Sequence, residues 1–300
     1  MTPSRDTEPI PSAWRSRGEG ASRGTAPIRG DGAPREGKPP RNTFKLLRIA
    51  ILLLVLLMVA LTTWQDRYRS TRWRDPLYVA IYPVAADDSP VTRAYIAALD
   101  LGRFKPVDRF FAREAERYHL GTNEPIRTRL RSELRARPPQ RAANAGLLAT
   151  ALWSLRLRYW TWRVSGHANE PEDVRIFILY HDPALTPTVP HSLGLTKGLI
   201  GVVYAFAAPQ MNAENNVVIA HELLHTVGAT DKYGVADDAP RYPDGYGDPA
   251  QMPLYPQRTA ELMAGRRMLA PHRWQQALSL DEVVIGRSTA LEIRWPQRAR

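Results

Sequence analysis

The chain has 300 residues, of which 44% are hydrophobic, and a formal net charge of +11 at neutral pH. Its length accommodates one or two domains, and its apolar fraction is sufficient for a hydrophobic core. The absence of cysteine excludes a disulfide framework, a zinc site with cysteine ligands and a cysteine nucleophile. A basic charge is compatible with nucleic-acid binding, but no recognition motif accompanies it, so we expect no nucleic-acid partner.

The first segment, residues 1–43, is rich in Pro, Gly, Ser and Arg and contains almost no clustered apolar residues. Such a composition buries too little surface to offset the entropy lost on ordering. It predicts a disordered basic tail.

An unbroken apolar run, residues 49–61, follows the tail. Residues 46–64 have about the length that crosses the hydrocarbon core of a bilayer, and Arg48 and Trp64 lie at their two ends, near the lipid headgroups. We therefore predict a transmembrane signal-anchor helix over residues 44–66, which makes the lipid bilayer a partner. A cleaved signal peptide and a buried core helix are the alternatives.

The charges around this run favour one orientation. Basic residues from Arg35 to Arg48 precede it, which is typical of a cytoplasmic N-terminus, although further arginines follow it. We expect a single-pass membrane protein whose C-terminal domain is extracytoplasmic.

Residues 67–300 are expected to form one α+β domain with a mixed sheet, because strand and helix patterns alternate along them. Apolar or alternating patterns predict strands at residues 77–84, 126–134, 174–180 and 198–206. Helices are predicted at residues 91–99, 108–118 and 144–162, the last with an apolar face of Leu148, Leu152, Leu155 and Tyr159. A further helix, capped by Asn212, is expected to end near Val227, before a loop over residues 229–258. A capping box at Ser279–Glu282 predicts the last helix.

The helix after Asn212 contains the sequence His221-Glu222-Leu223-Leu224-His225. Positions i and i+4 lie on one face of a helix, so His221 and His225 can bind the same metal ion. Glu222 is turned about 100° from His221, where it can accept a proton from metal-bound water. This pattern predicts a catalytic Zn²⁺ site.

A third ligand is expected downstream. Gly228 favours the end of the helix, and Asp231 follows three residues later, so the chain can fold back and offer a carboxylate. Glu261 is the alternative third ligand. The loop also contains four carboxylates of the kind that bind Ca²⁺: Asp237, Asp238, Asp244 and Asp248. Acidic residues in a Pro/Gly-rich loop are usually just solvated, so we do not predict a calcium site.

The residues His221–Asp231, HELLHTVGATD, resemble the HExxHxxGxx[HD] signature of the metzincin metallopeptidases, and the final Asp is similar to the snapalysin-type branch. Glu261–Gly265 resembles the Met-turn that these enzymes place beneath the metal. The resemblance implies a metzincin-like zincin domain with His221, His225 and Asp231 on zinc, Glu222 as the base and Met263 in the floor. The chain departs from the family in its lack of cysteine and in a long insertion between Asp231 and Met263.

The resemblance also implies the substrate, a peptide or protein whose extended backbone pairs with an edge strand, here residues 198–206. Tyr233 is the first candidate to stabilise the oxyanion, ahead of Tyr242, Tyr246 and Tyr255. The function predicted is therefore a membrane-anchored zinc endopeptidase. The alternative is a membrane-tethered metal-binding protein of zincin fold without proteolytic activity, and the sequence leaves the oligomeric state open.

Overall fold

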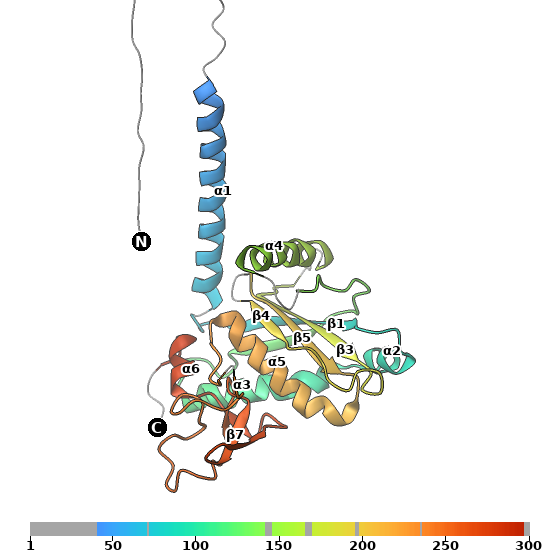
Figure 1. Cartoon of the computed structure of the whole chain (residues 1–300), viewed down its shortest axis with the longest axis vertical. Helices are drawn as coiled ribbons and strands as arrows, with labels where there is room; N and C mark the ends of the chain where they lie inside the picture. The colour runs from blue at the N-terminus through green and yellow to red at the C-terminus, as the bar shows by residue number, and fades with distance from the viewer. Residues whose placement is uncertain are drawn as a thin grey trace, which may run out of the picture. The chain divides into compact units, whose positions relative to one another are not determined.

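The computed structural model describes residues 41–70, 72–141, 146–165, 170–195, 198–234 and 236–296. Residues 1–40 of the predicted disordered tail lie outside these ranges, and residues 41–43 begin helix α1, Arg41–Ser70 (Figure 1). The chain divides into two units, Met1–Leu52 and Leu53–Arg300, and every element after α1 belongs to the second.

Helix α1 contains the apolar run that the sequence analysis assigned to a membrane. Nowhere in the described part of the chain, however, does a helix combine the length and the apolar character that a bilayer crossing requires. As a helix, the uninterrupted run of residues 49–61 is about 20 Å long, whereas the hydrocarbon core is about 30 Å thick. Lys45 and Arg48 precede this run, and Asp66 and Arg67 follow it. The predicted transmembrane helix over residues 44–66 is therefore wrong.

A five-stranded sheet, in the order β2-β1-β3-β5-β4, forms the centre of the described part of the second unit. The strands β1 (Leu77–Ala85), β2 (Ile126–Leu130), β3 (Val174–His181) and β5 (Ile200–Phe206) are parallel. The short strand β4 (Leu193–Leu195) pairs antiparallel with β5 at one edge. The mixed sheet and its interleaved helices confirm the predicted α+β class and the four predicted strands.

Helices cover both faces of this sheet (Figure 1). On one face, α2 (Pro90–Ala97), α3 (Lys105–Arg117) and α5 (Asn212–Val227) enclose the larger apolar core. On the other face, α4 (Leu147–Val164) covers a smaller core that includes Phe177 and Val202. Two short 3₁₀ turns, η1 (Leu101–Phe104) and η2 (Pro209–Met211), lead into α3 and α5. Because both faces are covered, β1 and β3 are buried along almost their whole length.

Helix α4 packs on a different face from the one predicted. The expected apolar face, Leu148, Leu152, Leu155 and Tyr159, is exposed. Trp153 and Leu157 are buried instead. The Trp153 indole donates a hydrogen bond to the carbonyl of Pro139 (2.7 Å), and Trp160 packs edge-on against Phe177, with ring centroids 4.8 Å apart. These contacts of the large aromatic rings fix the rotation of the helix.

After α5, the chain follows a long irregular path with short elements. Residues 229–258, predicted as a loop, contain no helix or strand where the structure describes them. Beyond this loop, the described residues form two short strand pairs and one short helix. The pairs are β6 (Ala260–Glu261) with β9 (Val283–Val284) and β7 (Arg266–Ala270) with β8 (Arg273–Gln276), and the helix is α6 (Arg287–Glu292).

The helix predicted at Ser279–Glu282 does not form there. The amide of Glu282 donates to the carbonyl of Ser279 (3.2 Å), and the Glu282 carboxylate accepts from the amide of Leu278 (3.2 Å). The capping-box residues therefore close a turn, and the last helix, α6, begins only at Arg287.

Candidate metal centre

Helix α5 presents two histidines one turn apart. Its buried residues, among them Ile219, Leu223 and Leu224, pack in the larger core, so His221 and His225 share the opposite, partly exposed side. The helix ends at Gly228, whose φ of 110° is the left-handed C′ conformation predicted from the sequence. The predicted cap is wrong: Asn212 is the first helical residue, and its side-chain oxygen accepts a hydrogen bond from the Tyr95 hydroxyl.

The structure brings the three predicted ligands together. The Nε2 atoms of His221 and His225 lie 3.2 and 3.1 Å from the same carboxylate oxygen, Oδ1 of Asp231. One ligand atom from each residue lies within 4.8 Å of the other two. Among the described residues, this is the one group of His, Asp and Glu side chains that could hold a metal ion.

Backbone carbonyls orient both imidazole rings. Nδ1 of His221 lies 3.1 Å from the carbonyl oxygen of Leu262, and Nδ1 of His225 lies 2.9 Å from that of Ala229. A carbonyl oxygen only accepts, so each Nδ1 is the donor and carries a proton. Each Nε2 is then the nitrogen that can bind a metal, and both point toward Asp231.

The segment that carries Asp231 is held on both sides. The Glu292 carboxylate of α6 accepts hydrogen bonds from the amide of Thr230 (2.9 Å), the hydroxyl of Thr230 (2.7 Å) and the ammonium of Lys232 (2.7 Å). The amide of Lys232 donates to the carbonyl of Met263 (3.0 Å). The residues before and after Asp231 are thus fixed to α6 and to the segment beneath the histidines.

Glu222 lies beside the three candidate ligands rather than among them. Its side chain is buried, and its Oε2 atom makes no hydrogen bond among the described residues. Burial raises the pKa of this carboxyl group, although the neighbouring His221 and His225 act in the opposite direction. A buried carboxylate oxygen without a partner is uncommon in proteins and suits a group that receives a proton from a bound molecule.

The ligand cluster shifts the protonation of its own members. Burial alone would raise the pKa of Asp231, but hydrogen bonds from His221 and His225 outweigh it and hold the pKa well below its ordinary value. Burial acts to lower the pKa of His221, yet its hydrogen bond to Asp231 and the charge of Glu222 raise it overall. Without a metal ion, a proton on His221 is therefore stabilised by Asp231, and a metal ion would have to displace it.

The carboxylate of Glu261, the alternative third ligand, is occupied by other hydrogen bonds. Its fully buried carboxylate accepts hydrogen bonds from the amide of Ala264 (3.0 Å), the amide of Gly286 (3.1 Å) and the hydroxyl of Thr289 (2.7 Å). These hydrogen bonds connect the segment around Glu261 to the start of α6. Met263 is also fully buried in this segment, next to Leu262, whose carbonyl orients His221.

The cluster opens into a cleft of about 640 Å³, lined by all three ligands, Glu222 and Tyr233. Burial raises the pKa of Tyr233 to about 12, and the negative charge of Asp231 adds to this effect. Its hydroxyl therefore keeps its proton at neutral pH and can donate a hydrogen bond. Of the other candidate tyrosines, Tyr246 is hydrogen-bonded to Tyr255 (2.9 Å) and packs against Tyr242, and none of the three lines the cleft.

The edge of the sheet at this cleft is β4, not the predicted strand over residues 198–206. Strand β5, which includes most of those residues, is paired on both sides, with β3 and with β4. Strand β4 passes directly over α5, because a Cβ atom at Gly194 would meet Cβ of His225 and lie 2.5 Å from the carbonyl oxygen of Glu222. Among the described strands, the sheet edge beside the cluster is therefore β4, whose residues Leu193 and Gly194 line the cleft.

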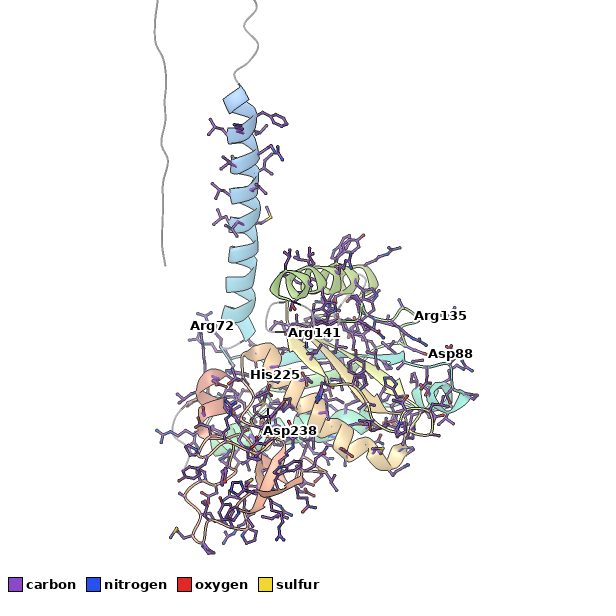
Figure 2. The ribbon with its side chains drawn as sticks, in the orientation of Figure 1. Arg72, Asp88, Arg135, Arg141, His225 and Asp238 are labelled. Atoms are coloured by element: carbon purple, nitrogen blue, oxygen red, sulfur yellow. The ribbon has the colours of Figure 1, made fainter. Side chains whose placement is uncertain are left out.

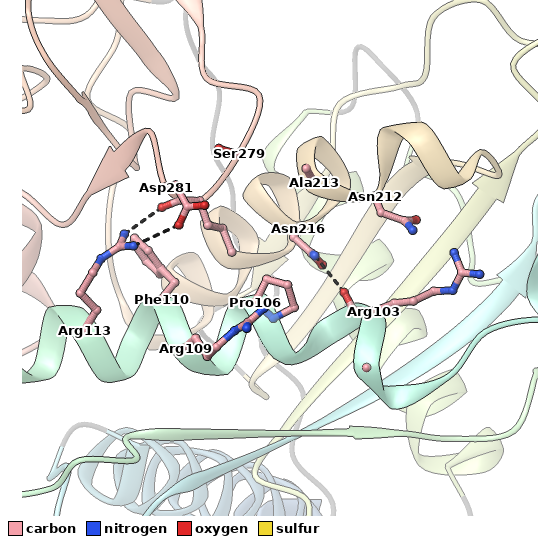
Figure 3. A pocket seen from close by; sticks show the side chains of 12 residues that line it. Arg103, Pro106, Arg109, Phe110, Arg113, Asn212, Ala213, Asn216, Ser279 and Asp281 are labelled. Atoms are coloured by element: carbon pink, nitrogen blue, oxygen red, sulfur yellow. Dashed lines mark hydrogen bonds and ion pairs between the residues drawn. The ribbon is translucent and has the colours of Figure 1, made fainter.

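A second cavity of about 670 Å³ lies between α3, the first turn of α5 and the segment around Asp281 (Figure 3). Its lining includes Arg103, Arg109 and Arg113 but no histidine. The Arg113 side chain lies 3.3 Å from Asp281 and donates to the carbonyl of Leu280 (2.8 Å) at one end of this cavity. This cavity is therefore separate from the candidate metal centre.

Sequence reasoning missed several residues of the site. Lys232 and Glu292 hold the Asp231 segment, Gly194 allows the edge strand to approach α5, and His191 lines the cleft and acts electrostatically on Glu222. No local sequence pattern marks these residues, because each contributes through a contact distant in the chain. Figure 2 shows His225 and Asp238 in the same region of the domain, but Asp238 pairs with Arg266 (3.3 Å) and not with the cluster.

Comparisons with known proteins do not assign this chain to a family. No protein-family model matches it, and a search of curated proteins found no match.

Proposed function

We propose that the protein is a zinc-dependent peptidase whose metal centre is formed by His221, His225 and Asp231. The donor set of two imidazoles and one carboxylate is the set that catalytic zinc uses, with a fourth position left for water. A tetrahedral ion with bonds of about 2.0–2.1 Å has ligand atoms about 3.4 Å apart. The separations of 3.1 and 3.2 Å between the imidazole nitrogens and Oδ1 of Asp231 fit this requirement.

The single observation that carries the proposal is the position of Glu222. A structural metal site has no use for a buried carboxylate beside the ligands whose Oε2 makes no hydrogen bond among the described residues. A hydrolytic site needs such a group as its general base. This favours a peptidase over a protein that only binds the metal.

When bound, the zinc ion would lower the pKa of a water molecule and polarise the carbonyl group to be attacked. Glu222 would accept the proton of that water and pass it to the leaving amine. Tyr233 lines the same cleft and keeps its hydroxyl proton, so it can donate a hydrogen bond to the oxyanion. The free edge of β4 can pair with an extended polypeptide, which supports peptides or proteins as the substrate class.

Metal analysis and peptide cleavage on the same preparation test this proposal. The wild-type chain is expected to hold about one zinc ion and to cleave members of a diverse peptide library. Replacing His221 and His225 together by alanine should abolish zinc binding and peptide cleavage, because Asp231 alone offers only one ligand. Stoichiometric zinc in the double variant would refute the site, and a zinc-loaded wild type that cleaves no peptide would refute the activity.

A further inference from the structure

Helix α4 has apolar side chains on two sides, and only one side is covered. Trp153 and Leu157 are buried against the sheet. A second set is exposed to 52–76% and comprises Leu148, Leu152, Leu155, Tyr159 and Trp162. Their spacing of four, three, four and three residues forms one continuous stripe along the helix. A helix that is apolar all round is normally buried, so an exposed stripe of this size indicates an interaction surface.

Arginines flank the stripe. At 100° per residue, Arg156 and Arg163 lie along one border of the stripe and Arg158 along the other. Helix α4 contains no acidic residue. In the part of the chain that the structure describes, none of these arginines has a hydrogen-bond or ion-pair partner. The uncovered side of α4 is therefore both apolar and positively charged.

This combination selects one kind of partner. We propose that α4 binds the surface of a membrane rich in anionic lipid, with its axis parallel to that surface. Leucine side chains can enter the acyl region, Tyr and Trp favour the boundary with the headgroups, and arginines attract lipid phosphates. A second copy of the chain fits less well, because two stripes packed together would bring arginines of like charge close to one another.

The position of α4 gives the interaction a consequence for the rest of the domain. It covers the sheet face opposite to α5, the helix that carries His221 and His225 (Figure 1). A domain lying on lipid through α4 therefore keeps the metal centre on the side away from the membrane. The inference does not depend on the proposed peptidase activity.

The absence of cysteine allows a local test in the full-length protein. An environment-sensitive fluorophore is attached to Leu152→Cys, within the stripe, or to Leu185→Cys, a similarly exposed position in the loop after β3. Vesicles of phosphatidylglycerol should raise and blue-shift the emission at position 152 but not at 185. Phosphatidylcholine vesicles should have a much smaller effect, because they carry no net charge.

Charge variants complete the experiment. In the labelled background, Arg156→Gln with Arg163→Gln should weaken vesicle binding about 30-fold, whereas the control pair Arg135→Gln with Arg273→Gln should change it less than threefold. Three results would each overturn the inference: no response at position 152, equal responses at positions 152 and 185, or a response without vesicles that grows with protein concentration. A response that needs no vesicles and grows with protein concentration would show self-association through α4.

Discussion

At the scale of single residues, the choice of third ligand depends on which carboxylate has free oxygens. Asp231 lies against both imidazoles, whereas the Glu261 carboxylate is fully engaged by two amides and a hydroxyl. Asp231→Ala should therefore lose zinc and keep its fold. Glu261→Ala should keep zinc when folded but lose at least about 2 kcal/mol of unfolding free energy, because buried donors are left without partners.

Zinc content and urea unfolding, measured on both variants, separate the two roles. The assignment of Asp231 fails if the Glu261 variant is folded and free of zinc while the Asp231 variant is fully loaded.

Residue spacing in the sequence was sufficient to predict His221, Glu222 and His225 as a group, because a helix fixes the relation between positions i and i+4. It also led to Asp231, since Gly228 ends the helix and turns the chain back. Glu292 could not be predicted, because its role comes from a contact of α6 with Thr230, 62 residues earlier. Side chains that act through such contacts leave no local pattern.

At the scale of elements, the approach of β4 to α5 determines the shape of the helix turn that carries Glu222 and His225. A Cβ at Gly194 would overlap α5 at His225 and Glu222. Gly194→Ala should therefore displace β4 or α5, reduce stability by about 1–3 kcal/mol and lower kcat/KM by up to about 100-fold. Gly121→Ala is the matched control, since a Cβ there meets nothing within 4 Å. Equal behaviour of the two variants in unfolding and peptide-cleavage assays would contradict this account of β4.

The contact between α6 and the Asp231 segment predicts a dependence on pH. Burial acts to raise the pKa of Glu292, but hydrogen bonds from Lys232 and Thr230 outweigh it and lower the pKa below its ordinary 4.5. A carboxylate with a lowered folded-state pKa stabilises the fold above the unfolded-state value, and this contribution disappears as pH falls through the folded-state value.

The stability difference between the wild type and Glu292→Gln should thus be constant near neutrality and shrink as the pH falls below about 4.5. Urea unfolding at a series of pH values measures this difference in unfolding free energy. Glu170→Gln serves as a control for an exposed surface carboxylate. A difference that grows toward acid would show that the sign of the shift is wrong.

Three elements differ from what the sequence patterns predict, each for its own physical reason. Helix α4 was given the wrong buried face because both of its sides are apolar, and hydrophobic period alone cannot choose between them. The strand at residues 198–206 was expected at an edge, but three residues of β4, too short for a pattern, pair beside it. The capping box at Ser279–Glu282 forms a turn, because its hydrogen bonds do not require a following helix.

At the scale of the whole molecule, the two faces of the sheet carry different features. One face carries α5 and the candidate metal centre, and the other carries α4 with its exposed apolar stripe. The order of strands and helices in the sequence was enough to predict the α+β class. The apolar run at residues 49–61 reaches the length of a membrane span only if it is extended across Arg48 and into polar residues, which is why the predicted transmembrane helix is wrong.

The central claim is that Glu222 transfers the proton in a reaction at the His221, His225 and Asp231 centre. Glu222→Gln tests it most directly, because the amide keeps the shape of the side chain but cannot accept the proton. Zinc content and the rate of peptide hydrolysis are measured on the same preparations of wild type and variant. We predict unchanged zinc content and hydrolysis slower by about 10²–10⁴-fold. Equal rates of hydrolysis by the two zinc-loaded proteins would contradict the account.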